Sequence, residues 1–188
     1  MRIISGLFKG KKILQPADKM TRPLKDLTKE SVFNIIEHSN KFSVNIKDSI
    51  VLDLYSGVGS FGLECLSREA KHVTFIENYK GVLPILKKNL FGLRNINNYK
   101  ILNQDLNLKS EIILSKFRQK NDIVFLDPPF KNKNLEKILI NINNNKILKK
   151  DGIVIIHRHK KENDNYPENF KILEKKIYGI SKIIFGLF

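Results

Sequence analysis

The turn Asp127-Pro128-Pro129-Phe130 combines residue types that could hold a nucleobase amine for reaction. Two prolines fix φ and remove two N–H donors, so the turn is stiff and its carbonyls, especially that of Pro128, can point into a pocket. The Asp127 carboxylate and the Pro128 carbonyl could each accept one amine hydrogen, which would direct the nitrogen lone pair towards an electrophilic methyl group. Phe130 could stack a base drawn out of its helix. The alternative is a proline turn with an incidental aromatic residue.

A glycine-rich loop upstream could form the pocket for a second ligand. It follows an apolar run and precedes a predicted helix, whose first turn offers unpaired N–H groups. Gly57 and Gly59 lack a Cβ, which permits a tight turn and close approach of a ligand. Asp53, at the end of the predicted strand, could accept hydrogen bonds from a cationic or hydroxylated ligand. Residues 57–62 also match G-x-G-x-x-G, which by itself is compatible with a dinucleotide.

Acidic residues recur at the carboxyl ends of predicted strands, where doubly wound sheets bind ligands. They are Asp53, Glu77, Asp105 and Asp127. Glu77 follows Gly57 by 20 residues, the spacing at which an acid reaches ribose hydroxyls in nucleotide-binding units. Asp105 would then line an adenine. Each acid alone could be a helix cap or a loop carboxylate, but four in these places favour a bound ligand.

Short apolar runs alternate with helical patterns along the rest of the chain. Strands are predicted from residue 50 and over 73–77, 99–103, 123–127 and 152–157, helices from residue 60 and over 79–91, 110–117 and 135–142, and two closing strands over 170–176 and 179–188. This alternation predicts an α/β fold with a mostly parallel sheet, helices on both faces and an antiparallel last strand.

Composition bounds the class of protein. The 188 residues suffice for one well-cored domain with a small appendage. No apolar run is long enough to span a bilayer and no signal-peptide core is present, so a cytoplasmic location is expected. The formal charge of +15 favours a polyanion, and nucleic acid is preferred to a membrane surface because no basic amphipathic helix stands out. The single cysteine, Cys65, excludes an internal disulfide and is predicted to be a small apolar residue on the helix after the glycine loop.

Basic residues are concentrated near the N-terminus. Two short strands are predicted over 2–6 and 10–14, followed by a helix over 26–39. We therefore divide the chain into a basic hairpin and helix extension, residues 1–48, and a main domain, residues 49–188. The candidate RNA-binding residues are Arg2, Lys9, Lys11, Lys12, Arg22 and Lys131.

The segments 53–59 and 127–130 together resemble the S-adenosylmethionine-dependent methyltransferases that modify nucleobase amines. Residues 61–68 and four N-terminal segments, 2–6, 9–12, 21–23 and 31–34, narrow the resemblance to the RsmD family. That resemblance implies a Rossmann-like class I methyltransferase sheet and direct in-line methyl transfer to N2 of a guanine in small-subunit (16S) ribosomal RNA. The cofactor-binding residues expected from it are Asp53, Tyr55, Ser56, Gly57, Gly59, Glu77, Asp105 and Leu106, and the catalytic residues are Asp127, Pro128, Pro129 and Phe130.

Two stretches depart from the family pattern. After Arg22-Pro23 the usual pair of arginines is missing, and Lys25 and Lys29 cannot form the bidentate contacts of a guanidinium. His157 and His159 lie where many relatives carry an acid. A metal site is not expected there because a third ligand is missing. We predict instead that these histidines are polar residues at a strand end that touch RNA.

Other functions stay open from the residues alone. A dinucleotide oxidoreductase would use the glycine loop but leaves Asp127 to Phe130 unexplained. A non-catalytic RNA-binding protein would leave the paired acceptors without a role. The nearest alternatives are amine methyltransferases acting on DNA adenine N6 or on tRNA. We expect a monomer that acts on ribosomal RNA in the small subunit or an assembly intermediate.

Overall fold

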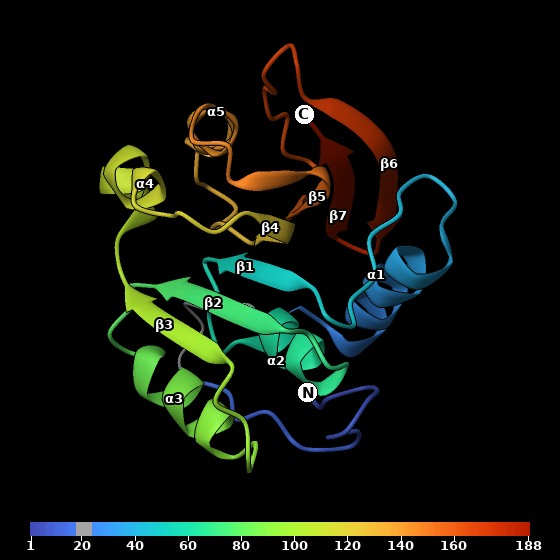
Figure 1. The fold of residues 1–188 in the computed structure, drawn as a ribbon, viewed down its shortest axis with the longest axis vertical. Helices are drawn as coiled ribbons and strands as arrows, with labels where there is room; N and C mark the ends of the chain where they lie inside the picture. The colour runs from blue at the N-terminus through green and yellow to red at the C-terminus, as the bar shows by residue number, and fades with distance from the viewer. Residues whose placement is uncertain (18–23) are drawn as a thin grey trace.

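The structure is a computed structural model that describes residues 1–17 and 24–188. Within these residues, seven strands form one sheet in the order β3-β2-β1-β4-β5-β7-β6 (Figure 1). The strands are β1 (Ile50–Leu54), β2 (His72–Glu77), β3 (Tyr99–Asn103), β4 (Asn121–Leu126), β5 (Leu148–His159), β6 (Lys171–Tyr178) and β7 (Ser181–Leu187). The helices are α1 (Asp26–His38), α2 (Ser60–Ser67), α3 (Leu83–Phe91), α4 (Leu106–Ser115) and α5 (Leu135–Asn144).

The inner strand β1 pairs in parallel with β2 on one side and with β4, the central strand, on the other. β2 and β3 pair in parallel, as do β4 and β5. The tail forms a hairpin, and its second strand, β7, lies antiparallel between β5 and β6. The predicted mostly parallel sheet with an antiparallel end is confirmed.

Helices cover both faces of the sheet because alternate residues of each strand point to opposite sides. Val51 and Phe125 belong to the hydrophobic cluster under α1, α2 and α3, whereas Leu52 and Val124 belong to the cluster under α4 and α5. Figure 1 shows α4 and α5 together on one side of the sheet. Among the described residues, every helix is too short or too polar to cross a membrane.

The N-terminal segment is less regular than the two strands predicted for it. It keeps a single bridge, between Arg2 and Lys12. The amides of Ile3 and Ile13 donate across the hairpin to the Lys11 and Met1 carbonyls at 2.9 and 3.0 Å. The pairing goes no further because the N–H groups of Ile4 and Ser5 donate instead to the Glu64 carboxylate of α2, at 2.8 and 2.9 Å. The segment is therefore attached to the helix that follows the glycine loop.

Glu64 is fully buried and anchors this attachment. Besides the two amides, its carboxylate lies 3.6 Å from the buried Lys29 ammonium and accepts a hydrogen bond from Arg68 Nε at 3.0 Å. Lys29 in turn donates to the Arg2 carbonyl at 2.7 Å. Burial lowers the pKa of Lys29, and Glu64 opposes that shift. Residues 1–17 and α1 thus share a buried ionic cluster with α2, and the predicted domain boundary at residue 48 stays a prediction.

Several element boundaries differ from the predicted ones, and three of the differences have a clear structural cause. α3 begins at Leu83 instead of 79 because the Asn78 and Tyr79 amides turn back to bond the Glu77 carboxylate. α4 begins at Leu106 instead of 110, capped by Asp105. β5 extends to His159 because it pairs with β7 beyond residue 157.

Candidate active site

The carboxyl ends of the inner strands β1, β2 and β4 lie together at one end of the sheet. Leu54 pairs with both Ile76 and Leu126, so the residues next to them, including Asp53, Glu77 and Asp127, are brought together. Their charges influence one another, since those of Asp127 and Glu77 both raise the pKa of Asp53. This end of the sheet therefore gathers acidic residues in a chain whose net charge is strongly positive.

Asp53 is the most unusual of these acids because its side chain is buried without being fully satisfied. Its Oδ2 accepts a hydrogen bond from Gly62 N–H at 3.0 Å, and its Oδ1 has no partner among the described residues. Burial raises the pKa of Asp53 well above its ordinary value, and the two neighbouring carboxylates add to the shift. A buried acceptor without a partner suits a cationic group of a ligand.

The two loop glycines turn out to serve different purposes. Gly57 has a φ of +56°, and a Cβ there would meet no atom within 4 Å, so its surroundings are open to a ligand. Gly59 has a φ of +85°, and a Cβ there would come within 2.5 Å of Leu86 Cδ1 on α3. Gly59 is thus required by packing as well as by its backbone conformation, and Gly57 leaves the space for close approach.

Two side chains hold the loop in place. Glu77 accepts hydrogen bonds from the backbone N–H groups of Gly57 at 2.7 Å, Asn78 at 2.9 Å and Tyr79 at 2.8 Å. The Ser56 hydroxyl is buried and donates to the Asp53 carbonyl at 2.7 Å. A carboxylate has about four acceptor positions, so Glu77 keeps one for a ligand hydroxyl.

Tyr55 connects the glycine loop with the turn after β4. Its φ of +60° is uncommon for a residue with a side chain. Its hydroxyl donates to Asn107 Oδ1 on α4 at 2.7 Å and accepts from Asn132 Nδ2 at 3.3 Å. Burial raises the pKa of Tyr55, so the hydroxyl keeps its proton. The predicted cofactor side and the predicted catalytic side are therefore joined through one phenol.

The two residues predicted to line an adenine lie at the start of α4. Asp105 caps this helix by accepting a hydrogen bond from Asn107 N–H at 2.8 Å. This is the helix-cap role that the sequence left open for each acid taken alone. Leu106 is buried in the cluster under α4 and α5. Only the uncapped oxygen of Asp105 is left for a ligand.

Asp127 is held by His157, whose position corrects the prediction that it touches RNA. His157 is only 3% exposed; its Nδ1 lies 2.8 Å from Asp127 Oδ1, and its Nε2 lies 2.9 Å from Ser181 Oγ. Burial lowers the pKa of His157, but the Asp127 charge and hydrogen bond outweigh it, and the net shift is upward. Phe130 packs edge-on against His157 and against His159, with ring centroids 5.7 and 5.2 Å apart.

Arg158 is a further residue whose role the sequence does not indicate. It is 1% exposed, and its guanidinium donates to the Pro129 carbonyl at 3.0 Å, to the Asn132 carbonyl at 2.9 Å and to Asp164 at 2.9 Å. The turn after β4 is thereby clamped to the loop after β5. The available signal was an arginine between two histidines directly after the apolar run 153–156. Its partner carbonyl is that of Pro129, and the predicted acceptor role of the Pro128 carbonyl stays a prediction.

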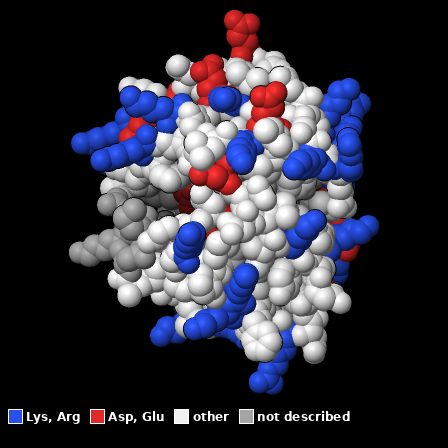
Figure 2. Space-filling view, turned by 90° about the vertical axis from the view of Figure 1, so that its left-hand side faces the viewer, with Lys and Arg blue, Asp and Glu red and all other residues white. Residues whose placement is uncertain are grey.

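The candidate RNA-binding residues lie on the surface. Arg2, Lys9, Lys11 and Lys12 are exposed on the N-terminal segment, and Lys131 is exposed after Phe130. Arg22 lies outside the described residues. Figure 2 shows lysine and arginine side chains around much of the face that it presents, with acidic side chains gathered in its upper half.

Comparison with known proteins gives an independent view of this site. The family model described as "Conserved hypothetical protein 95" matches residues 1–186. The chain is 35% identical over 184 residues to Ribosomal RNA small subunit methyltransferase D of Haemophilus influenzae, covering 96% of this chain and 90% of that protein. The chain belongs to the RsmD family.

Solved structures agree with this membership. A chain from Haemophilus influenzae, provisionally described as a methylase, is 33% identical with a TM-score of 0.75 and covers 99% of this chain and 97% of its own length. A chain from Escherichia coli, provisionally described as a methyltransferase, is 27% identical with a TM-score of 0.81, covering 99% of this chain and 96% of its own. The predicted Rossmann-like methyltransferase fold of this RsmD family member is therefore confirmed.

Proposed function

We propose that the chain transfers a methyl group from S-adenosylmethionine to N2 of a guanine in small-subunit ribosomal RNA. The observation that carries this proposal is the Asp127 carboxylate, fixed by His157 beside the Phe130 ring, at the same sheet edge as the unpaired acceptor of Asp53. Relatives 35% and 29% identical to this chain are named Ribosomal RNA small subunit methyltransferase D. Neither hydride transfer nor simple RNA binding needs such an acceptor.

The residues around the glycine loop fit the cofactor. S-adenosylmethionine supplies, when bound, an electrophilic methyl group on a positively charged sulfur. The free Oδ1 of Asp53 would receive the ammonium of its methionine portion, and the open space at Gly57 would admit the chain close to the backbone. The remaining acceptor position of Glu77 would bind the ribose, and the start of α4 would border the adenine.

The chain's own contribution to the reaction is to hold the amine. His157 occupies Oδ1 of Asp127, which leaves Oδ2 to accept an amine hydrogen. Transfer would break the S–C bond of the cofactor as the N–C bond forms, with a neutral thioether as the leaving group. The methylated amine would then be acidic and would pass a proton to Asp127 or to water, so no stronger base is needed. Positioning and acceptor hydrogen bonds then provide most of the rate enhancement. Phe130 would carry the base on its ring face.

The proposal extends to the setting of the reaction. We expect a monomer in the cytoplasm whose partner is ribosomal RNA, in the small subunit or an assembly intermediate. The exposed cations of residues 1–12 and Lys131 would contact RNA phosphates. The N-terminal segment is bonded through Glu64 to the helix that follows the glycine loop, so its cations are attached to the element that borders the proposed cofactor site.

Methyl incorporation tests the proposal directly. Labelled S-adenosylmethionine is offered with naked ribosomal RNA, with 30S particles and with tRNA, and the modified nucleotide is mapped. Label at a guanine N2 of the small-subunit RNA is expected, and Asp127→Ala should lower it by orders of magnitude while cofactor affinity stays near normal. Label only in tRNA or DNA, or full turnover by the variant, would refute the proposal.

A further inference from the structure

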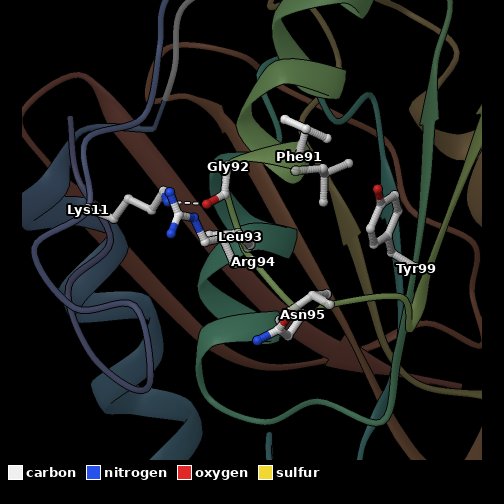
Figure 3. A pocket seen from close by; sticks show the side chains of 9 residues that line it. Lys11, Phe91, Gly92, Leu93, Arg94, Asn95 and Tyr99 are labelled. Atoms are coloured by element: carbon white, nitrogen blue, oxygen red, sulfur yellow. Dashed lines mark hydrogen bonds between the residues drawn. The ribbon is translucent and has the colours of Figure 1, made fainter.

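A hollow of about 670 Å³ lies at the opposite end of β3 from the candidate active site. Three segments enclose it: the N-terminal segment, the end of α3 with the turn that follows, and the first residue of β3. Figure 3 shows Lys11 and Arg94 on one side and Tyr99 on the other, with the Lys11 amine bonded to the Gly92 carbonyl. The volume is that of an ordinary small-molecule site.

The lining of the hollow combines exposed aromatic and cationic groups. Phe91 is 87% exposed, although the preceding residue of α3, Leu90, is buried in the core. Arg94 is exposed beside it, and the described residues that line the hollow include no carboxylate. An exposed ring with neighbouring cations is the combination that binds unpaired nucleotides, through stacking and phosphate contacts. Lys11 uses one donor for Gly92 and keeps two.

The edge strand β3 leads from the hollow to the candidate active site. β3 is the last strand of the sheet and pairs with β2 alone among the described strands. From Tyr99 to Asn103 the strand rises by about 13 Å at roughly 3.3 Å per residue. Lys100 and Asn103 are exposed along it, and Asp105 follows. A single strand of a few nucleotides could therefore reach from the transfer site to the hollow.

We infer that the hollow binds an unpaired nucleotide of the RNA substrate, with the base on Phe91 and the phosphate on Lys11 and Arg94. The inference rests on the proposed function, because it takes the RNA that is methylated to be the RNA that is bound. The nucleotide is unpaired because a base within a duplex shows no free face to Phe91. The hollow would thus favour substrate whose target guanine lies near an open strand.

The test measures RNA affinity separately from methyl transfer. Fluorescence anisotropy with a labelled twelve-nucleotide oligoadenylate and with an RNA duplex of equal length is compared for the unaltered chain, Phe91→Ala and Arg94→Gln. Phe91→Ala should bind the single strand about 5- to 100-fold more weakly and the duplex equally well. Arg94→Gln should lower the dependence of log affinity on log salt by about 0.7. The control is Ile177→Ala, an exposed apolar residue on β6 at the other edge of the sheet, which should change neither.

Each outcome decides the matter. No binding of the single strand by the unaltered chain, equal affinity of Phe91→Ala, or equal losses on single strand and duplex would overturn the inference. Melting temperature and cofactor affinity, which the exposed substitutions should leave unchanged, report on folding. If RNA binds at the hollow but no RNA is methylated, the proposed function is refuted and the inference that the hollow binds RNA is retained. If ribosomal RNA is methylated and Phe91→Ala keeps the kcat/KM and RNA affinity of the unaltered chain, RNA binding at the hollow is refuted and the proposed function is retained.

Discussion

Exchanging His157 for asparagine or glutamine separates its two hydrogen bonds. An asparagine amide nitrogen can take the place of Nδ1, which faces Asp127 at 2.8 Å, and a glutamine amide that of Nε2, which faces Ser181 at 2.9 Å. If His157 acts by fixing Asp127, His157→Asn should keep most activity and His157→Gln should lose it. His157 would then be a positioning residue, since it acts through Asp127.

The size of the effect follows from the contact and its exposure. A hydrogen bond to an ionised group contributes about 1.5–3 kcal/mol. The Asp127 side chain is 21% exposed and can regain some hydration, so the lower end applies. If this free energy is lost in the transition state, kcat of His157→Gln falls about tenfold. The asparagine variant should stay within about threefold of the unaltered chain.

The assay is single-turnover methylation of ribosomal RNA across pH, with cofactor affinity measured by calorimetry. Cofactor affinity should not change. The raised pKa of His157 adds a signature in stability: the His157–Asp127 pair stabilises the fold fully below about pH 6.5 and loses this contribution as pH rises through the folded-state pKa. Both variants should lack that dependence. Unaltered kcat in His157→Gln, or equal losses in both variants, would refute the reasoning.

Five further substitutions probe the buried charges and the loop. Glu64→Gln removes the buried counter-charge of the Lys29 ammonium and leaves only the exposed Asp26 carboxylate, 3.9 Å away. It should lower the free energy of unfolding, measured in urea, by about 3 kcal/mol, whereas Glu69→Gln, in an exposed pair, should cost at most about 1 kcal/mol. Asp53→Asn should weaken cofactor binding but raise the melting temperature of the ligand-free chain. The pKa of Asp53 is raised in the folded state, so its ionisation destabilises the fold at every pH above the unfolded-state pKa of about 3.9, and asparagine removes that cost. Alanine is strained at both loop glycines because their φ angles are positive. Gly57→Ala meets no protein atom and should mainly reduce cofactor affinity, whereas Gly59→Ala also meets Leu86 and should unfold at a lower temperature than Gly57→Ala.

Each of these expectations can fail on its own. Equal destabilisation by the two glutamine substitutions would show that the Glu64 cluster is not the anchor described. A ligand-free Asp53→Asn chain that melts below the unaltered one near pH 8 would show that the carboxylate is satisfied in solution. Matching thermal stability of the two alanine variants would remove the packing role of Gly59.

The sequence predicts features that follow from local pattern and misses those that depend on distant contacts. The apolar runs and the glycine loop predict the strands and the sheet edge where Asp53, Glu77 and Asp127 meet. The burial of His157 was not predictable, because it depends on pairing between β5 and β7. The role of Glu64 was not predictable either, because its amide partners lie about 60 residues away in the N-terminal segment. That contact is why the predicted pair of strands is reduced to a single bridge.

The position of β1 has a consequence for how the chain folds. Val51 pairs with Val73, close in sequence, and with Ile123, far along the chain, so the first pairing can form early and the second must await a long loop closure. Asp53 lies on the early half and Asp127 on the late one, so the complete pocket is absent until the halves dock. We therefore expect S-adenosylmethionine to slow unfolding of the native chain while leaving its refolding rate unchanged.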